Sequence, residues 1–146
     1  MKNKVLVLVA HPDDETIGCG GTIAKHIFYG DQVKLLALSS GVGSRAKLKK
    51  NEKENRIQCA HKAAKILGAS WISFADFKDN SFDSHPRLEI IKFIESVKKD
   101  YVPNILYTHS GTDLNIDHRI TFEAALVAFR PINNNYTEIR LSLIHI

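Results

Sequence analysis

The stretch VLVLVAHPDDETIGCGG, from Val5 to Gly21, decides the fold of this chain. Its first six residues, Val5 to Ala10, are apolar at every position and rich in β-branched side chains, which is typical of a parallel strand covered on both faces. Apolar residues at helical spacing follow from Thr16 to Tyr29, and Gly30 supplies a C-terminal stop. The stretch therefore predicts a buried strand that leads into an amphipathic helix.

The rest of the chain repeats this alternation of short apolar segments and longer amphipathic ones. Strands are predicted at 32–40, 70–75 and 104–110, and helices at 52–67, 87–99 and 121–129. Alternating strands and helices form right-handed βαβ units. The predicted fold class is therefore α/β, with a three-layer, Rossmann-like, open and mostly parallel sheet that has helices on both faces.

The composition of the 146 residues, 44% hydrophobic and 25% charged, is typical of one globular domain. The formal net charge is +4, but the lysines gather at 45–56, where glutamates interrupt them and no aromatic residue occurs. We interpret that segment as solvated, not as a nucleic-acid interface. Cys19 and Cys59 are too few for a disulfide framework, and no apolar run is long enough for a signal peptide or for membrane insertion. A cytoplasmic location is expected.

Polar side chains follow the first and fourth predicted strands, whose carboxyl ends meet at one crevice. The two stretches, HPDDE and HSGTDLNIDH, together hold His11, Asp13, Asp14, Glu15, His109, Asp113, Asn115, Asp117 and His118. Three imidazole and carboxylate ligands with one open position are what a catalytic zinc site requires. A divalent cation would also explain why so many carboxylates gather there.

The glycines of GCGG, residues 18–21, raise the alternative of a dinucleotide-binding loop. Their spacing is not G-x-G-x-x-G, and the acidic residues before them would repel a pyrophosphate. We interpret these glycines as close packing of the first helical turn under the site.

The motifs AHPDDETIGCGGTIAK and YTHSGTDLNIDHR resemble the PIG-L/LmbE superfamily of zinc-dependent N-deacetylases, over roughly residues 3 to 131. The resemblance implies a deacetylase domain at 1–131 that removes acetyl from N-acetylglucosamine-type conjugates. It implies that Zn²⁺ is bound by His11, Asp14 and His118, and that Asp13 is the general base acting on metal-activated water. An alternative for Asp13 is an N-cap of the following helix.

Asn115 departs from the pattern of many family members, in which a histidine stands two residues before the Asp-His pair. That histidine is expected to help stabilise the tetrahedral oxyanion, so another group must supply this role here. The Asn115 amide could donate, or His109 could swing in from the strand end. Asp117 is expected to orient a neighbouring polar group or metal ligand.

Substrate contacts are expected from three residues. The resemblance matches a sugar-binding arginine to Arg45 and a hydroxyl-binding acid to Asp79, and His109 is the third candidate. Plain solvent exposure is the alternative for Arg45 and Asp79. The remaining histidines are interpreted as lying outside the site, because none falls at a predicted strand end: His26, His61, His85 and His145.

Two other readings of the whole chain stay open. One is a non-catalytic metal or small-molecule binding module on the same fold. The other is an inactive fragment, because family members continue beyond this length and the strand-like tail at 132–146 would need a pairing partner. We expect this tail to be an incomplete end. An amino-sugar conjugate is the expected partner, with no nucleic acid, no membrane insertion and a homo-oligomer as an open option.

Overall fold

The computed structural model describes residues 2–44, 51–132 and 136–145. Its elements follow the predicted alternation of strands and helices. In chain order they are β1 (Lys4–Val9), α1 (Asp14–Phe28), β2 (Gln32–Ala37), α2 (Glu52–Leu67), β3 (Ser70–Phe74), the 3₁₀ turn η1 (Phe82–Ser84), α3 (Arg87–Asp100), β4 (Ile105–His109), α4 (Ile116–Ala128) and β5 (Glu138–Ser142).

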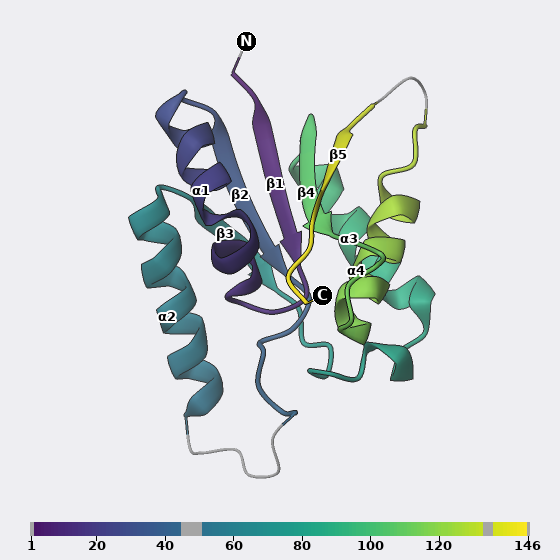
Figure 1. Cartoon of the computed structure of the whole chain (residues 1–146). Helices are drawn as coiled ribbons and strands as arrows, with labels where there is room; N and C mark the ends of the chain where they lie inside the picture. Colours follow the sequence, from purple (N-terminus) through teal and green to yellow (C-terminus); the bar gives the residue numbers. More distant parts are fainter. Residues whose placement is uncertain (1, 45–50, 133–135, 146) are drawn as a thin grey trace.

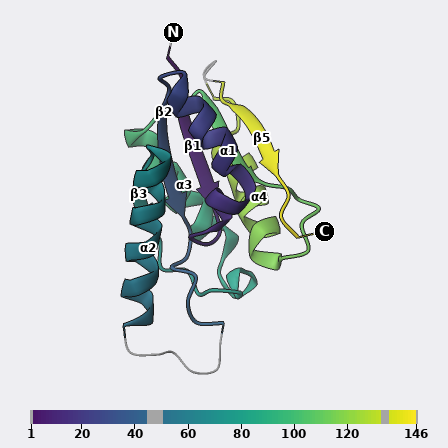
Figure 2. The same cartoon turned by 60° about the vertical axis from the view of Figure 1, so that its left-hand side comes forward.

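The five strands form one parallel sheet in the order β3-β2-β1-β4-β5, which confirms the predicted fold class. Helices α1 and α2 cover one face and α3 and α4 the other (Figure 1). Figure 2 shows the same three layers after rotation, with α1 and α2 in front of the sheet. The strand order reverses between β1 and β4, so the carboxyl ends of these two strands flank the topological switch point.

The sheet is buried on both faces, as the continuous apolar pattern of its strands requires. Leu6 and Leu8 of β1 pack with the α3 and α4 side, whereas Val5, Val7 and Val9 pack with the α1 and α2 side. Every side chain from Val5 to Ala10 is buried. The central strand is therefore held from both sides, and the residue that follows it is placed firmly.

Two helix starts differ from the sequence prediction. Helix α1 begins at Asp14 instead of Thr16, and α4 begins at Ile116 instead of Thr121. In α4 the earlier start follows from capping, because the Asn115 side chain accepts hydrogen bonds from the backbone N–H groups of Asp117 and His118. Asp117 and His118 therefore lie in a helical turn and not in a loop.

The tail at 132–146 contributes the edge strand β5, which pairs in parallel with β4 from Ile105↔Glu138 to His109↔Ser142. The strand-like apolar pattern thus has its pairing partner within this chain. In the described residues, no helix has the length and apolar character needed to cross a membrane.

Candidate metal centre

Three side chains from separate elements converge beyond the carboxyl ends of β1 and β4. His11 follows β1, Asp14 opens α1, and His118 lies in the first turn of α4. Asp14 Oδ2 is 3.4 Å from His11 Nδ1 and 3.2 Å from His118 Nε2. All three residues are buried, and their candidate ligand atoms lie within 4.8 Å of one another. The predicted ligand set is thus assembled by the fold.

The chain makes a sharp bend at Asp13, which places Asp14 at this centre. Asp13 has φ 133° and ψ −28°, a backbone conformation that non-glycine residues rarely adopt. The Glu15 carboxylate holds this bend by accepting hydrogen bonds from the Asp13 N–H at 2.9 Å and from the Thr16 hydroxyl at 2.8 Å. Asp13 occupies the N-cap position of α1, but its side chain forms no capping hydrogen bond. The side chain of Asp13 is therefore free for another role.

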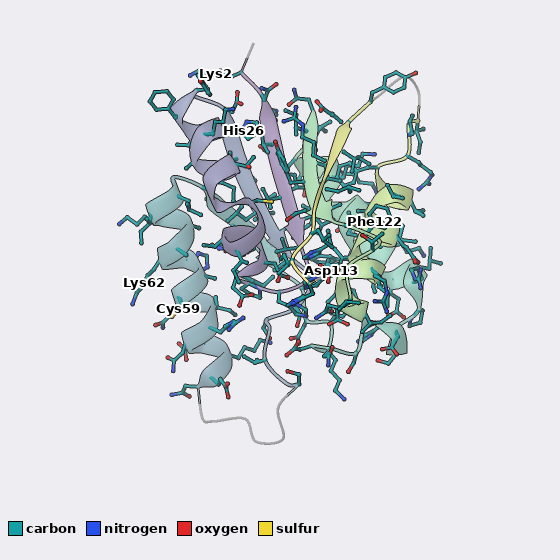
Figure 3. All side chains as sticks on the ribbon, viewed as in Figure 1. Lys2, His26, Cys59, Lys62, Asp113 and Phe122 are labelled. Carbon is teal, nitrogen blue, oxygen red and sulfur yellow. The ribbon has the colours of Figure 1, made fainter. Side chains whose placement is uncertain are left out.

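The second ring nitrogen of each histidine, the one that does not face Asp14, lies close to another carboxylate. His11 Nε2 is 3.0 Å from Asp117 Oδ2, and Asp117 is itself fixed by the backbone N–H groups of Asn80 at 2.6 Å and Phe82 at 3.0 Å. His118 Nδ1 lies 3.1 Å from Asp113 Oδ2. Figure 3 labels Asp113, near the carboxyl end of β4 and the start of α4. Carboxylates behind ligating imidazoles are the usual support of a metal site.

The donor set fits a zinc ion. When the neutral His11 ring donates from Nε2 to Asp117, its Nδ1 keeps the lone pair that faces Asp14, so a bound metal would displace the second proton of this ring. Both ring nitrogens of His118 are buried and form no hydrogen bond with the described residues, although carboxylate oxygens lie close to them. A buried nitrogen with an unused lone pair is costly without a partner. Two imidazoles and one carboxylate are ligands that zinc prefers in catalytic sites.

The protonation of the centre reflects its crowded carboxylates. Burial disfavours a charge on His11, but the carboxylates of Asp117 and Asp14 outweigh it and raise the pKa of His11 to about 9. Burial acts against the Asp14 carboxylate as well, yet the imidazoles of His11 and His118 beside it hold its pKa well below the usual range. The centre therefore concentrates a negative charge that a bound cation would neutralise.

A pocket of about 630 Å³ opens over the centre, and Asp13 projects into it. The Asp13 side chain is 47% exposed, and its Oδ2 accepts a bond from Arg56 Nη2 at 2.8 Å. Partial burial raises the pKa of Asp13, with a contribution from the neighbouring Asp14, while Arg56 opposes the shift. A carboxyl with a raised pKa beside a metal site is suited to accept and return a proton.

Only some of the other predicted site residues line the pocket. Asn115 and Asp79 line the pocket, and Asp79 accepts a bond from the Ser44 N–H while its other oxygen lies 3.2 Å from His11 Nε2. Asp117 is fully buried beneath His11. His109 is 1% exposed and is not among the pocket-lining residues, because its ring lies behind His118. Arg45 lies outside the described residues.

Arg56 and His145 are among the pocket residues that the sequence interpretation missed. Arg56 belongs to the segment interpreted as solvated, but α2 turns one face to the pocket. The spacing i, i+3, i+4, i+7 along that helix was the available signal, and it corresponds to Glu52, Asn55, Arg56 and Cys59. His145 was placed outside the site, but it lines the pocket with its ring centroid 5.3 Å from that of His118. The missing signal was β5, whose end brings His145 to the same crevice.

Comparison with known proteins places this centre in a family. The family model PIG-L, described as GlcNAc-PI de-N-acetylase, matches residues 6–129. This chain belongs to the PIG-L family. Its resemblance to PIG-L/LmbE proteins, expected from the two motifs, is thereby confirmed. The matched range contains all three residues of the candidate metal centre and Asp13.

Two deacetylases and a hydratase are among the proteins that this chain is similar to. The diacetylchitobiose deacetylase of Thermococcus kodakarensis is 34% identical over 129 residues, which are 82% of this PIG-L chain and 43% of that protein. The N,N'-diacetylchitobiose deacetylase structure from Pyrococcus horikoshii has a TM-score of 0.78 at 23% identity, covering 96% of this chain and 60% of that one. GalB, the 4-carboxy-2-hydroxymuconate hydratase of Pseudomonas putida KT2440, has a TM-score of 0.74 at 29% identity, covering 97% and 62%. The chain thus spans less than two thirds of each.

Proposed function

We propose that this chain is a zinc-dependent hydrolase that removes the acetyl group from the amide nitrogen of an N-acetylglucosamine-type conjugate. One observation carries the proposal: His11, Asp14 and His118 converge at the base of a pocket into which the Asp13 carboxyl projects. The PIG-L family match and the similarity to a diacetylchitobiose deacetylase support an N-acetylated amino sugar as substrate. A cytoplasmic location is part of the same proposal.

Each residue has a distinct part in the proposed reaction. Zinc, when held by His11, Asp14 and His118, would polarise the amide carbonyl and lower the pKa of water. Asp13 takes a proton from the attacking water and delivers it to the nitrogen of the leaving amine. Since Asp13 is half-exposed in the pocket while Asp14 is buried, the two neighbouring carboxyls serve different functions.

Asn115 is our candidate for the second electrophile. Its side-chain oxygen is occupied by the backbone N–H groups of Asp117 and His118, so its amide N–H donors must point elsewhere. Because Asn115 lines the pocket, these donors are available to a developing oxyanion. Asp117 holds His11 from behind, and we propose that Asp79 and Arg56 contact sugar hydroxyl groups from the pocket wall.

Zinc content and amine release together test the proposal. Purified protein should contain about one zinc per chain by elemental analysis, and it should release free amine from members of a panel of N-acetylglucosamine conjugates. Zinc bound without amine release from any conjugate would favour the non-catalytic binding module. A chain that binds no zinc under saturating conditions would contradict the proposed function.

Hydration of an unsaturated acid is the second candidate function, favoured by the 29% identity to the hydratase GalB over 97% of this chain. Hydration also requires an activated water and a carboxyl that transfers a proton, both of which this pocket could provide. The absorbance of 4-carboxy-2-hydroxymuconate, followed in parallel with the amine assay, distinguishes the hydratase from the deacetylase. Loss of absorbance without amine release would favour the hydratase.

A further inference from the structure

His109, the last residue of β4, lies against His118 and Asp14 of the candidate ligand set and is bonded to the residue before His11. Its ring stacks on His118, with centroids 3.8 Å apart and planes inclined by 15°. Its Nε2 accepts a hydrogen bond of 2.9 Å from the backbone N–H of Ala10, which directly precedes His11. The same nitrogen lies 3.4 Å from Asp14 Oδ2. In contrast to Asp13 or Asn115, His109 does not line the pocket.

The bond from Ala10 decides what His109 can do. A ring nitrogen that accepts an N–H must carry its lone pair there, so the proton of the neutral ring sits on Nδ1. That lone pair is then occupied and not free for a metal. Nδ1 is buried, and within the part of the chain that the structure describes its proton has no hydrogen-bond acceptor. The hydrogen bonds of this imidazole therefore do not explain why it is buried at this position, since one of its nitrogens is unsatisfied.

We propose that His109 is a positioning residue that fixes the ring plane of His118 and joins it to the end of β1. The inference rests on the proposed zinc site, and it adds a residue outside the ligand set. Stacking prevents the His118 ring from rotating about its Cβ–Cγ bond, so that Nε2 stays directed at Asp14 and Nδ1 at Asp113. The bond to Ala10 holds β1 and β4 in register just where His11 leaves the sheet.

A role as ligand is the competing interpretation of His109. His109, Asp113 and His118 also bring candidate ligand atoms within 4.8 Å of one another. That set is completely buried, and one of its imidazoles uses Nε2 to accept from Ala10. The set that includes His11 and Asp14 faces the pocket instead. The geometry therefore favours His109 as support, and the two roles predict different metal stoichiometry.

The test measures zinc affinity by chelator competition, and the visible absorption of the cobalt-loaded full chain. His109→Gln keeps an acceptor for Ala10 but removes the ring, and His109→Phe keeps a stacking ring but removes the acceptor. Thr108→Val, which replaces a neighbouring buried hydroxyl without a hydrogen bond, is the matched control. His118→Ala marks the loss of a ligand.

We expect both His109 variants to bind one zinc per chain with roughly 10–100-fold weaker affinity, and to change the cobalt spectrum. Thr108→Val should match the wild type in both. Affinity within twofold of the wild type in both His109 variants, or lost stoichiometry as in His118→Ala, would overturn the inference. If the wild-type chain itself binds no metal, the proposed zinc site fails. That outcome differs from one in which the wild type binds zinc and only the inference about His109 fails. Circular dichroism of the metal-free variants identifies any that do not fold.

Discussion

Asp13 and Asp14 are neighbours in the chain, but they occupy different surroundings. The strained backbone at Asp13, held by the Glu15 carboxylate, turns the first side chain toward the pocket and Arg56 and the second toward three histidines. Strain at a single residue thus places consecutive acids in separate surroundings.

Substituting each acid by its amide should separate base from ligand. We expect Asp13→Asn to keep its zinc but to lose roughly 10²–10⁴-fold in kcat, because an amide cannot accept the proton. Asp14→Asn should weaken zinc binding, because it removes the charged ligand between His11 and His118. Elemental analysis and steady-state kinetics measure the two effects. Equal loss of zinc in both variants would mean that the roles are wrongly assigned.

Asn115 caps α4 and is also the proposed donor to the oxyanion. Two substitutions separate these roles. Asn115→Ser retains a capping oxygen but no amide donor, so we expect melting close to that of the wild type with a reduced kcat. Asn115→Ala should also lose about 1 kcal/mol of stability, because the cap disappears. Thermal melts and kinetics report both quantities. An unchanged kcat in Asn115→Ser would remove the amide from the mechanism.

At the scale of elements, the turn between β4 and α4 depends on Gly111. A Cβ added at Gly111 would lie 2.6 Å from the Phe122 ring of α4, closer than real contacts allow. Phe122 and Asp113 are labelled on this part of the molecule in Figure 3. The turn leads directly to Asp113 and Asn115, so its position controls how α4 presents His118.

We expect Gly111→Ala to destabilise the protein by about 1–3 kcal/mol and to weaken zinc binding, because either the turn or Phe122 must move. Phe122→Leu provides the control, since a smaller side chain relieves the clash. In the double variant the losses should be less than additive, as measured by urea unfolding. Additive losses would indicate that the predicted contact does not exist.

The stability that the corner between α1 and β2 contributes should depend on pH in the acid range. A hydrogen bond of 2.6 Å from His26, with further bonds from Asn3, lowers the pKa of Asp31 to about 2. Because this pKa is below the ordinary value of about 3.9, the carboxylate stabilises the fold at neutral pH and loses that effect as the pH falls toward 2. Asp31→Asn should therefore reduce stability at pH 7, and its difference from the wild type should shrink between pH 5 and pH 2. Urea unfolding across this range tests it, and a constant difference would contradict the pKa shift.

For the whole molecule, the proposed ligands all lie before Arg119, whereas the end of the chain lines the pocket and supports Asp113. Backbone N–H groups of Ile144 and His145 donate to Asp113, which lies behind His118. We expect a variant ending at Arg140 to bind one zinc per chain, with less loss of affinity than His118→Ala. A zinc-dependent rise in melting temperature would report binding by the folded chain. Complete loss of zinc in this variant would assign the last residues an essential role in the metal centre.

The sequence predicts the part of the site that depends on local patterns. The apolar run before His11 identifies a central strand, and the second motif follows another strand, so their convergence could be anticipated from sheet geometry. The start of α4 could not, because its apolar periodicity begins at Thr121 while the Asn115 cap extends the helix to Ile116. Arg56 was missed because its neighbours in sequence are charged, and only packing shows which face of α2 meets the pocket.

Because the proposed metal ligands and the residues of α2 that line the pocket come from different crossover connections, they can change independently over evolution. Replacing Asn55 or Arg56 would reshape what the pocket accepts, while the ends of β1 and β4 would continue to gather His11, Asp14 and His118. Under the proposed function, such a division lets a lineage change its substrate without rebuilding the proposed metal centre. A fold of this kind is well suited to diversify by small steps in one helix.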